Sequence, residues 1–155
     1  MIREMRRKDK ALSLEETKAL LERGEYGFLA TISEDDTPYT MPISFVYNDN
    51  AIYIHCAQEG HRLENIQKNN NVCFNVVDSV KLMPAKFNTQ YKSAIVFGKI
   101  KVVDDLAEKR DGIISIVKKY SPDYQAAGMD YIEKSFDALK ILKIDISHMT
   151  GKCCL

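Results

Sequence analysis

The sequence predicts an α+β chain that is mainly β: a small, six-stranded antiparallel β-barrel with helices covering its ends. Three strand-like runs lie close together between Gly27 and Ala57, and the short turns between them favour antiparallel hairpins. A proline and two bulge-prone positions interrupt the predicted strands, which favours a strongly curved, closed sheet over a flat one. No repeat or linker divides the chain, so its 155 residues are expected to form a single domain.

The first two of the three runs differ in character. Gly27–Ile32 is nearly all apolar, which is typical of a strand buried on both faces. The acidic residues and proline of 34–38 predict a turn. Tyr39–Tyr47 then resumes the strand pattern, but Pro42 lies inside it. Because proline donates no hydrogen bond to a ladder, this strand is expected to be bulged or to lie at a sheet edge.

The third run, Ala51–Ala57, follows a turn at Asn48-Asp49-Asn50, where Asn and Asp tolerate a left-handed backbone. Alternation along a strand divides this run into two faces. Ile52, Ile54 and Cys56 share one face, and Tyr53, His55 and Ala57 share the other.

The helices are predicted from their end signals. Ser13 and Glu16 form a capping-box pattern, and the helix that they open is expected to end at Gly24. The other predicted helices are His61–Lys68, Leu106–Tyr120 and Met129–Ala138, with Asp123–Gly128 expected as a loop.

Three more strands complete the predicted sheet: Val72–Val77, Tyr91–Val103 and Leu139–Ile146. Ser79–Asn88 contains Pro84 and is expected to be a loop. Gly98 marks a bulge or bend in the long second strand. The apolar positions change phase between Ile141 and Leu142, which indicates another bulge.

Composition restricts the possible partners and location. Lys plus Arg and Asp plus Glu both number 22, and no apolar run could cross a membrane, so neither nucleic acid nor lipid is an expected partner. The basic arm of residues 1–10 lacks the apolar segment of a secretory signal. The four cysteines have no metal-ligand spacing and are too few for a disulfide scaffold, so we expect no metal site and a reducing, cytoplasmic location. Residues 147–155, with Cys153 and Cys154, are expected as a C-terminal tail.

Several segments, taken in order, carry a resemblance to a known family. They are Tyr26-Gly-Phe-Leu-Ala, Thr37-Pro-Tyr-Thr-Met-Pro-Ile-Ser-Phe, Ala51-Ile-Tyr-Ile-His-Cys-Ala-Gln-Glu-Gly-His-Arg, Tyr91-Lys-Ser-Ala-Ile-Val-Phe-Gly and Thr150-Gly-Lys. The chain resembles the pyridoxamine 5'-phosphate oxidase-like flavoproteins, and within them the nitroimidazole-resistance branch, from Met5 to Lys152. The resemblance implies a split β-barrel and a homodimer with FMN at its interface.

A phosphate needs backbone donors, hydroxyls or cations, and a helix N-terminus supplies such donors. The turn of Gln58, Gly60, His61 and Arg62 lies where the third strand meets a helix start. Gly60 permits close backbone approach, and Arg62 can bind phosphate oxygens through two hydrogen bonds. Gln58 departs from the family, which usually has a lysine nearby. The alternative interpretation is a solvated helix start with an exposed arginine.

The flavin ring needs a flat slot and hydrogen bonds to its pyrimidine edge. In the family, backbone groups of the second strand provide them, which corresponds here to Thr40, Met41, Pro42, Ile43 and Ser44. A strand interrupted at Pro42 has unpaired backbone groups to offer. The alternative is an edge strand whose proline only discourages aggregation.

The resemblance also places a histidine near the flavin, which corresponds to His55. An imidazole there could contact the ring or transfer a proton near neutral pH, whereas the alternative is a structural histidine. Ser93 corresponds to a residue that reaches the partner's flavin, and Lys152 belongs to the terminal family segment.

Two functions from different classes fit these residues. The first is an FMN-dependent oxidoreductase that passes electrons from a reduced donor to a nitro-aromatic or similar small molecule. The second is a flavin- or haem-binding protein without turnover. Pyridoxamine 5'-phosphate oxidation is a weaker third candidate, because it needs a second phosphate site and the strands show no second basic cluster.

Overall fold

The computed structural model describes residues 3–154. Its strands are β1 (Ala11–Leu12), β2 (Gly27–Ile32), β3 (Pro38–Ile43), β4 (Val46–Asn48), β5 (Ala51–Cys56), β6 (Asn71–Met83), β7 (Asn88–Val102) and β8 (Lys140–Cys154). Its α-helices are α1 (Leu14–Arg23), α2 (His61–Lys68), α3 (Leu106–Tyr120) and α4 (Gln125–Ser135). Short 3-10 turns cover Lys8–Lys10, Pro84–Lys86, Pro122–Tyr124 and Phe136–Ala138.

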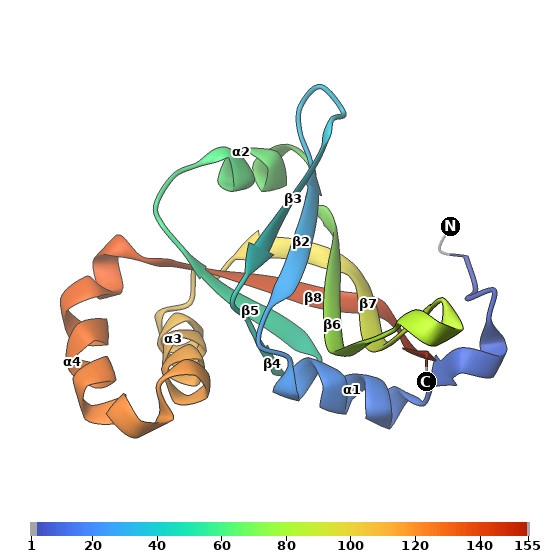
Figure 1. The fold of residues 1–155 in the computed structure, drawn as a ribbon. Helices are drawn as coiled ribbons and strands as arrows, with labels where there is room; N and C mark the ends of the chain where they lie inside the picture. Colours follow the sequence, from blue (N-terminus) through green and yellow to red (C-terminus); the bar gives the residue numbers. More distant parts are fainter. Residues whose placement is uncertain (1–2, 155) are drawn as a thin grey trace.

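One large antiparallel sheet organises the fold, in the order β3-β2-β6-β7-β8-β5-β4, with β1 added to β8. The sheet curves around one core (Figure 1) that contains Leu29, Ile54, Phe74 and Val96 from four different strands. Its two outermost strands, β3 and β4, follow each other in the chain. The α+β class and the antiparallel pairing are therefore as expected.

The expected closed ring of six strands is wrong in detail. Residues 3–154 contain eight strands, because the run Tyr39–Tyr47 divides at Ser44 and Phe45 into β3 and β4. β3 pairs with β2, and β4 pairs with β5, so the ladder stays open between the two halves. Pro42 lies on an outermost strand, as one of the two alternatives for it requires.

Two expectations about strand burial are also wrong. β2 is buried on one face only, since Phe28 is 45% exposed while Leu29 is fully buried. Between Ile141 and Leu142 there is no bulge, because the pairing with β5 continues through both. Ile141 packs beneath α3 and α4, and Leu142 packs in the barrel core, so both faces of β8 are apolar there.

The predicted bulge at Gly98 is confirmed, because the register between β7 and β8 shifts between Phe97 and Gly98. The glycine is needed there: a Cβ at Gly98 would lie 2.4 Å from the carbonyl oxygen of Asp145.

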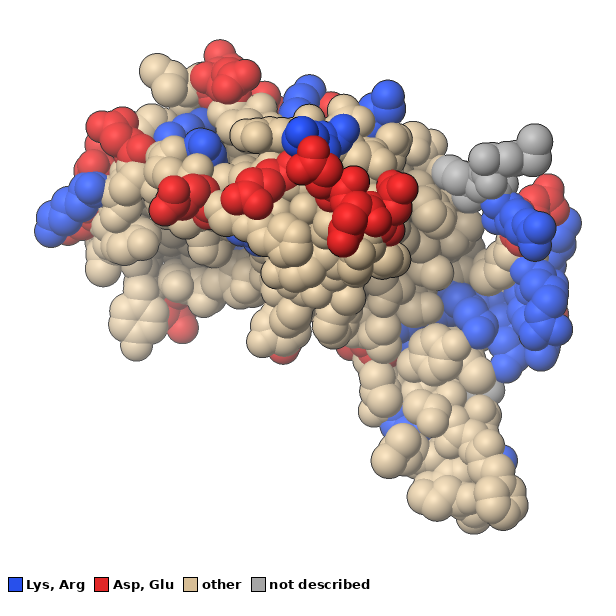
Figure 2. All heavy atoms as spheres, turned by 90° about the horizontal axis from the view of Figure 1, so that it is seen from above, with Lys and Arg blue, Asp and Glu red and all other residues tan. Residues whose placement is uncertain are grey.

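The expected loop Ser79–Asn88 is instead the end of a long hairpin, in which β6 continues to Met83 and β7 begins at Asn88. A bulge between Asp78 and Lys81, with Ser79 at a positive φ of 57°, allows the ladder to resume. A mostly uncharged projection stands out from the body in Figure 2, where this hairpin ends. The exposed apolar side chains of the hairpin are Val80, Leu82 and Phe87.

Local end signals place most helices correctly. The capping box of Ser13 and Glu16 is present, and α2 and α3 have the predicted bounds. The expected loop Asp123–Gly128 is wrong, since α4 begins at Gln125. Gly128 lets α4 approach α3 closely: a Cβ there would lie 2.4 Å from Val117.

The helices cover different parts of the sheet. α1 closes one end of the barrel with Leu20 and Leu21 in the core, whereas α3 packs on the outer side of β4, β5 and β8 with α4 beside it (Figure 1). Of the helices in residues 3–154, none combines the length and apolar character that crossing a bilayer requires. β8 extends to Cys154, so the last strand continues beyond the expected end at Ile146 and includes most of the expected tail, while Met1, Ile2 and Leu155 lie outside the described residues.

Candidate functional site

The turn between β5 and α2 presents unpaired backbone donors. Gly60 is the N-cap of α2 with φ 134°, a conformation that glycine adopts without strain. Its carbonyl oxygen accepts hydrogen bonds from the backbone N–H of Leu63 at 2.8 Å and of Glu64 at 3.2 Å. Within residues 3–154 no side chain caps this helix start, so the first N–H groups of α2 lack an intrahelical partner. Such a terminus favours an anion.

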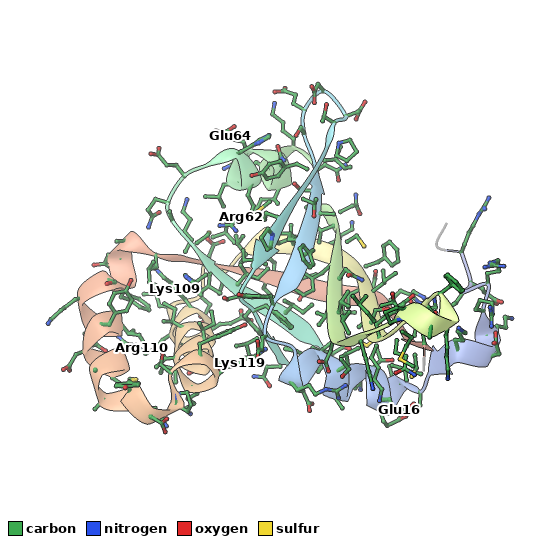
Figure 3. All side chains as sticks on the ribbon, viewed as in Figure 1. Glu16, Arg62, Glu64, Lys109, Arg110 and Lys119 are labelled. Atoms are coloured by element: carbon green, nitrogen blue, oxygen red, sulfur yellow. The ribbon has the colours of Figure 1, made fainter. Side chains whose placement is uncertain are left out.

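Arg62 extends from the first turn of α2 toward the strands below it (Figure 3). Its Nη1 lies 3.7 Å from Sδ of Met41 on β3, and its Nε is buried without a hydrogen-bond partner in residues 3–154. A buried guanidinium N–H without an acceptor is rare in folded proteins. The exposed arginine of the alternative interpretation is therefore wrong, and the donor set fits an anion such as a phosphate.

His55 lies on the outer face of β5, as the alternation predicted, while Ile52 and Ile54 are fully buried on the inner face. Partial burial lowers the pKa of His55 below its ordinary 6.5, and the positive charge of Arg62 lowers it further. The imidazole is therefore neutral at pH 7. The thiol of Cys56 on the inner face has its pKa raised by burial, an effect that Arg62 partly offsets.

The segment Thr40–Ser44 covers the second half of the outermost strand, β3, and the residue that follows it. β3 pairs with β2 on one side, and no other strand of the described chain pairs with its second side. Pro42 stands opposite Phe28, and both are exposed. The contact between Met41 and Arg62 brings this edge next to the α2 turn. Of these five residues, Met41 is the one whose side chain contacts Arg62 within residues 3–154.

Gln58 and His61 are held by other parts of the chain. The side chain of Gln58 donates to the carbonyl oxygen of Asp137 at 2.7 Å, and Nζ of Lys140 donates to the carbonyl oxygen of Gln58 at 2.9 Å. His61 Nε2 lies 3.1 Å from Oγ of Ser33, on the β2–β3 turn. Gln58 is thus not a free phosphate ligand, while Lys140 brings a cation to the turn that the sequence analysis missed.

Ser93 and Lys152 lie elsewhere in the chain. They face each other on β7 and β8, and Lys152 Nζ donates to Oη of Tyr91 at 2.8 Å. Along β8, Lys152 is twelve residues from Lys140, a separation of roughly 40 Å. Within one chain these residues therefore do not join Arg62.

The junction of β3 and β4 is fixed by two residues that the sequence analysis did not select. Tyr120 accepts a hydrogen bond from the backbone N–H of Phe45 at 2.8 Å, and Lys119 donates to the carbonyl oxygen of Phe45 at 2.9 Å. Burial lowers the pKa of Lys119 to about 8. No local sequence signal could identify this pair, because Phe45 lies 74 and 75 positions away.

His55 opens onto a cavity of about 370 Å³ between β5, α3 and α4. Its wall is formed by His55, Ile113, Ile116, Val117, Tyr120, Ser121, Tyr124, Ala127, Gly128, Tyr131 and Leu139. Neither the helical pattern of α3 nor that of α4 indicated such a space.

Comparison with protein families identifies one match. The family model described as "Pyridoxamine 5'-phosphate oxidase" matches residues 13–153, which is nearly the whole chain. A search of curated proteins finds no match.

Solved structures agree with this match. A candidate 5-nitroimidazole antibiotic resistance protein from Bacteroides thetaiotaomicron is 25% identical with a TM-score of 0.76, covering 92% of this chain and 86% of that one. An FAD-binding protein from Mesorhizobium loti is 20% identical with a TM-score of 0.67, covering 94% and 98%. An FAD- and haem-binding protein from Mycobacterium smegmatis is 21% identical with a TM-score of 0.76, covering 93% and 73%. The latter two likenesses concern the fold alone.

Proposed function

Because this chain belongs to the pyridoxamine 5'-phosphate oxidase family, we propose that it is an FMN-binding flavoprotein whose cofactor phosphate is held by Arg62. The observation that carries the proposal is the buried Nε of Arg62, which has no acceptor among residues 3–154. It lies at the uncapped start of α2, where backbone N–H groups also favour an anion.

The open edge of β3 is the proposed support for the flavin ring. Met41 touches Arg62, so a ligand with its phosphate at Arg62 lies next to the unpaired backbone of this strand. His55 is on β5, the strand that leads into α2, and it is close enough to Arg62 for its pKa to respond. The flavin supplies the redox chemistry, and the chain binds it, orients it and limits access of water.

We infer a reductase acting on a nitro-aromatic or similar small molecule, with a reduced nicotinamide as electron donor. The similarity to the Bacteroides protein supports the substrate class. His55, neutral at pH 7, can donate one hydrogen bond to a substrate oxygen. A phosphorylated substrate such as pyridoxamine 5'-phosphate is less favoured, because the residues lining the cavity beside His55 include no lysine or arginine.

A second candidate is a flavin- or haem-binding protein without turnover. The Mycobacterium smegmatis relative, named for both FAD and haem, is the observation that favours it. FAD also remains an alternative cofactor, because its phosphates could use the same helix start.

We further propose that the site is completed in a cytoplasmic homodimer. Ser93 and Lys152 lie far from Arg62 in one chain, so a shared flavin requires them to come from the partner. The outer side of the sheet, where Phe28 and Ile95 are partly exposed, would be the contact face.

The test of turnover is an anaerobic experiment with the FMN-loaded protein. NADH or NADPH should bleach the yellow flavin absorbance, and 2-methyl-5-nitroimidazole should restore it while being consumed. A flavin that binds but is not reoxidised by the nitro compound would contradict the reductase and favour the non-catalytic candidate. A haem spectrum on adding haemin, with no FMN bound, would contradict both the cofactor and the reaction.

A further inference from the structure

The cavity beside His55 lies outside the barrel, under the two helices that stand together on one flank of the molecule (Figure 1). α3 and α4 form its sides, and β5 contributes His55 to its floor. Its volume of about 370 Å³ falls within the range of small-molecule sites in proteins.

The lining of the cavity is apolar or neutral. Ile113, Ile116, Val117 and Leu139 supply aliphatic surface, and the described lining includes no Asp, Glu, Lys or Arg. The polar groups are hydroxyls and the imidazole of His55, which is neutral at pH 7 because its pKa is lowered. We propose that this cavity binds a neutral, planar aromatic molecule, and that this molecule is the substrate of the flavin centre, an inference that rests on the proposed function.

Some hydrogen-bonding groups of the cavity already bond to other parts of the protein, and others can bond to a ligand. The hydroxyl of Tyr120 donates to the carbonyl oxygen of Glu25 at 2.7 Å and accepts from Phe45, so it serves the β3–β4 junction. Tyr124 and Tyr131 are 72% and 59% exposed, and their hydroxyls are free to meet a ligand at the rim. Aromatic rims around aliphatic walls suit a flat ring.

Charged ligands are disfavoured because the nearby cations have other partners. Lys109 and Arg110 lie on α3 (Figure 3). Lys109 donates to the carbonyl oxygen of Phe136 at 2.7 Å, and Arg110 forms an ion pair with Glu133 of α4. Neither residue lines the cavity. An anion placed inside would lose its hydration without gaining a counter-charge, which is unfavourable.

His55 connects the cavity with the proposed cofactor site. Its ring lines the cavity, and the charge of Arg62 reaches it. A molecule in the cavity would therefore contact His55, the lining residue whose pKa responds to the charge of Arg62. This position favours a substrate over an unrelated ligand.

Two neighbouring alanines on α4 provide a matched pair of variants. Both alanines are exposed, but Ala127 lines the rim of the cavity and Ala126, the preceding residue, does not. Ala127→Phe should fill the space, and Ala126→Phe should place the same ring in solvent. The probes are nitrobenzene and benzoate, which have similar shape but differ by one negative charge.

Isothermal titration calorimetry of the FMN-loaded protein should detect one binding site for nitrobenzene. Benzoate should bind with an affinity about a hundredfold lower. Ala127→Phe should lower the affinity for nitrobenzene by at least about tenfold, and Ala126→Phe should leave this affinity unchanged. FMN affinity should be the same in both variants. If Ala127→Phe does not fold, Ile116→Phe on the opposite wall serves as the filling variant.

Equal binding of the two probes, or nitrobenzene binding that survives both filling variants, would overturn the proposal. A protein that binds FMN but no nitrobenzene would overturn the cavity alone. Nitrobenzene binding that is sensitive to Ala127→Phe in a protein that binds no FMN would overturn the proposed function and retain the cavity. If Ala127→Phe disrupted self-association while nitrobenzene did not bind the unaltered protein, a second chain would be the occupant and the proposal would fail.

Discussion

Arg62 supplies the charge around which the candidate site is arranged. Its Nε is buried without an acceptor in the described part of the chain, and its Nη1 has only a weak sulfur contact with Met41. Leaving such a donor unsatisfied costs about 1–3 kcal/mol or more for a charged group. A bound anion would remove this cost, so the side chain is better suited to a complex than to the free protein.

Replacing Arg62 with alanine should therefore weaken FMN binding by roughly tenfold to a hundredfold, equivalent to the loss of one charge-assisted hydrogen bond. The melting temperature of the FMN-free protein should change little, because the lost N–H had no partner. Quenching of flavin fluorescence measures the affinity. Lys68→Ala is the control, since Lys68 lies at the other end of α2 and pairs with Glu34. If the Arg62 and Lys68 variants bound FMN with equal affinity, Arg62 would not be a phosphate ligand.

His55 should make stability depend on pH. Its pKa is lowered from 6.5 in the folded chain, so between the folded pKa and 6.5 the unfolded chain binds more protons. The free energy of unfolding should therefore fall as the pH drops below 6.5 and stop falling below the folded pKa.

Urea denaturation from pH 7 down to about 5 measures this contribution. His55→Gln should reduce the slope of the free energy of unfolding against pH in this range. Identical slopes in the unaltered protein and the His55 variant would mean that the ring is as well hydrated in the folded chain as in the unfolded one.

At the scale of single elements, the junction of β3 and β4 depends on the end of α3. Phe45 is fully buried, so its backbone groups need partners from the protein. The hydroxyl of Tyr120 accepts from its N–H, while Lys119 donates to its carbonyl oxygen. These contacts hold the segment where the sheet changes from one half to the other, next to the edge proposed for the flavin ring.

Tyr120→Phe should destabilise the fold by about 1–3 kcal/mol, because it leaves the buried N–H of Phe45 without an acceptor. Tyr124→Phe is the matched control, as its side chain is 72% exposed and the same hydroxyl is removed. Equilibrium urea unfolding compares the two. A Tyr120 variant as stable as the control would show that water replaces the hydroxyl at the junction.

Elements with local end signals were predicted well, and those decided by distant packing were not. The capping box at Ser13 and the cap at Asp105 lie within a few residues of the helices that they start. The apolar pair Ile141 and Leu142 suggested a bulge only because one strand was assumed to have one buried face. The α3–α4 pair, which comes just before β8 in the chain and folds back onto it, buries the other face.

The residues of the candidate site also differ in whether a local sequence signal or tertiary packing reveals them. The sequence selects Gly60 and Arg62 as site candidates because they lie in one short turn, which the structure places at the start of α2. Lys140 reaches the same turn from β8, 82 positions away from Gln58, and no pattern in the chain links the two. The orphaned Nε of Arg62 also depends on tertiary burial, which a sequence pattern does not give.

For the whole molecule, the outer side of the sheet is the surface proposed for contact with a second chain. Phe28 pairs with Asn75, Asn75 with Ile95, and Ile95 with Thr150, so these residues form one row across β2, β6, β7 and β8. Phe28 and Ile95 are 45% and 39% exposed. A two-fold interface on this face would bury them and bring Ser93 of each chain toward the other chain's site.

Ile95→Lys should therefore convert a dimer into a monomer and weaken FMN binding at the same time, since a ligand shared by two chains stabilises their assembly. Light scattering after size-exclusion chromatography, at low protein concentration and with and without FMN, measures the molar mass and thus the oligomeric state. Leu106→Lys is the control, because Leu106 is an exposed apolar residue at the start of α3, away from this row. A monomeric parent protein that binds FMN with full affinity would remove Ser93 and Lys152 from the site.

The central claim is that the protein recognises the phosphate of FMN through Arg62 and the start of α2. The direct measurement compares the affinities of FMN and riboflavin, which differ by that phosphate, in the unaltered protein and in Arg62→Ala. FMN should bind more tightly than riboflavin by on the order of a hundredfold, because its phosphate makes several charge-assisted hydrogen bonds, and Arg62→Ala should lose most of this preference. Equal affinity for FMN and riboflavin in the unaltered protein would contradict it.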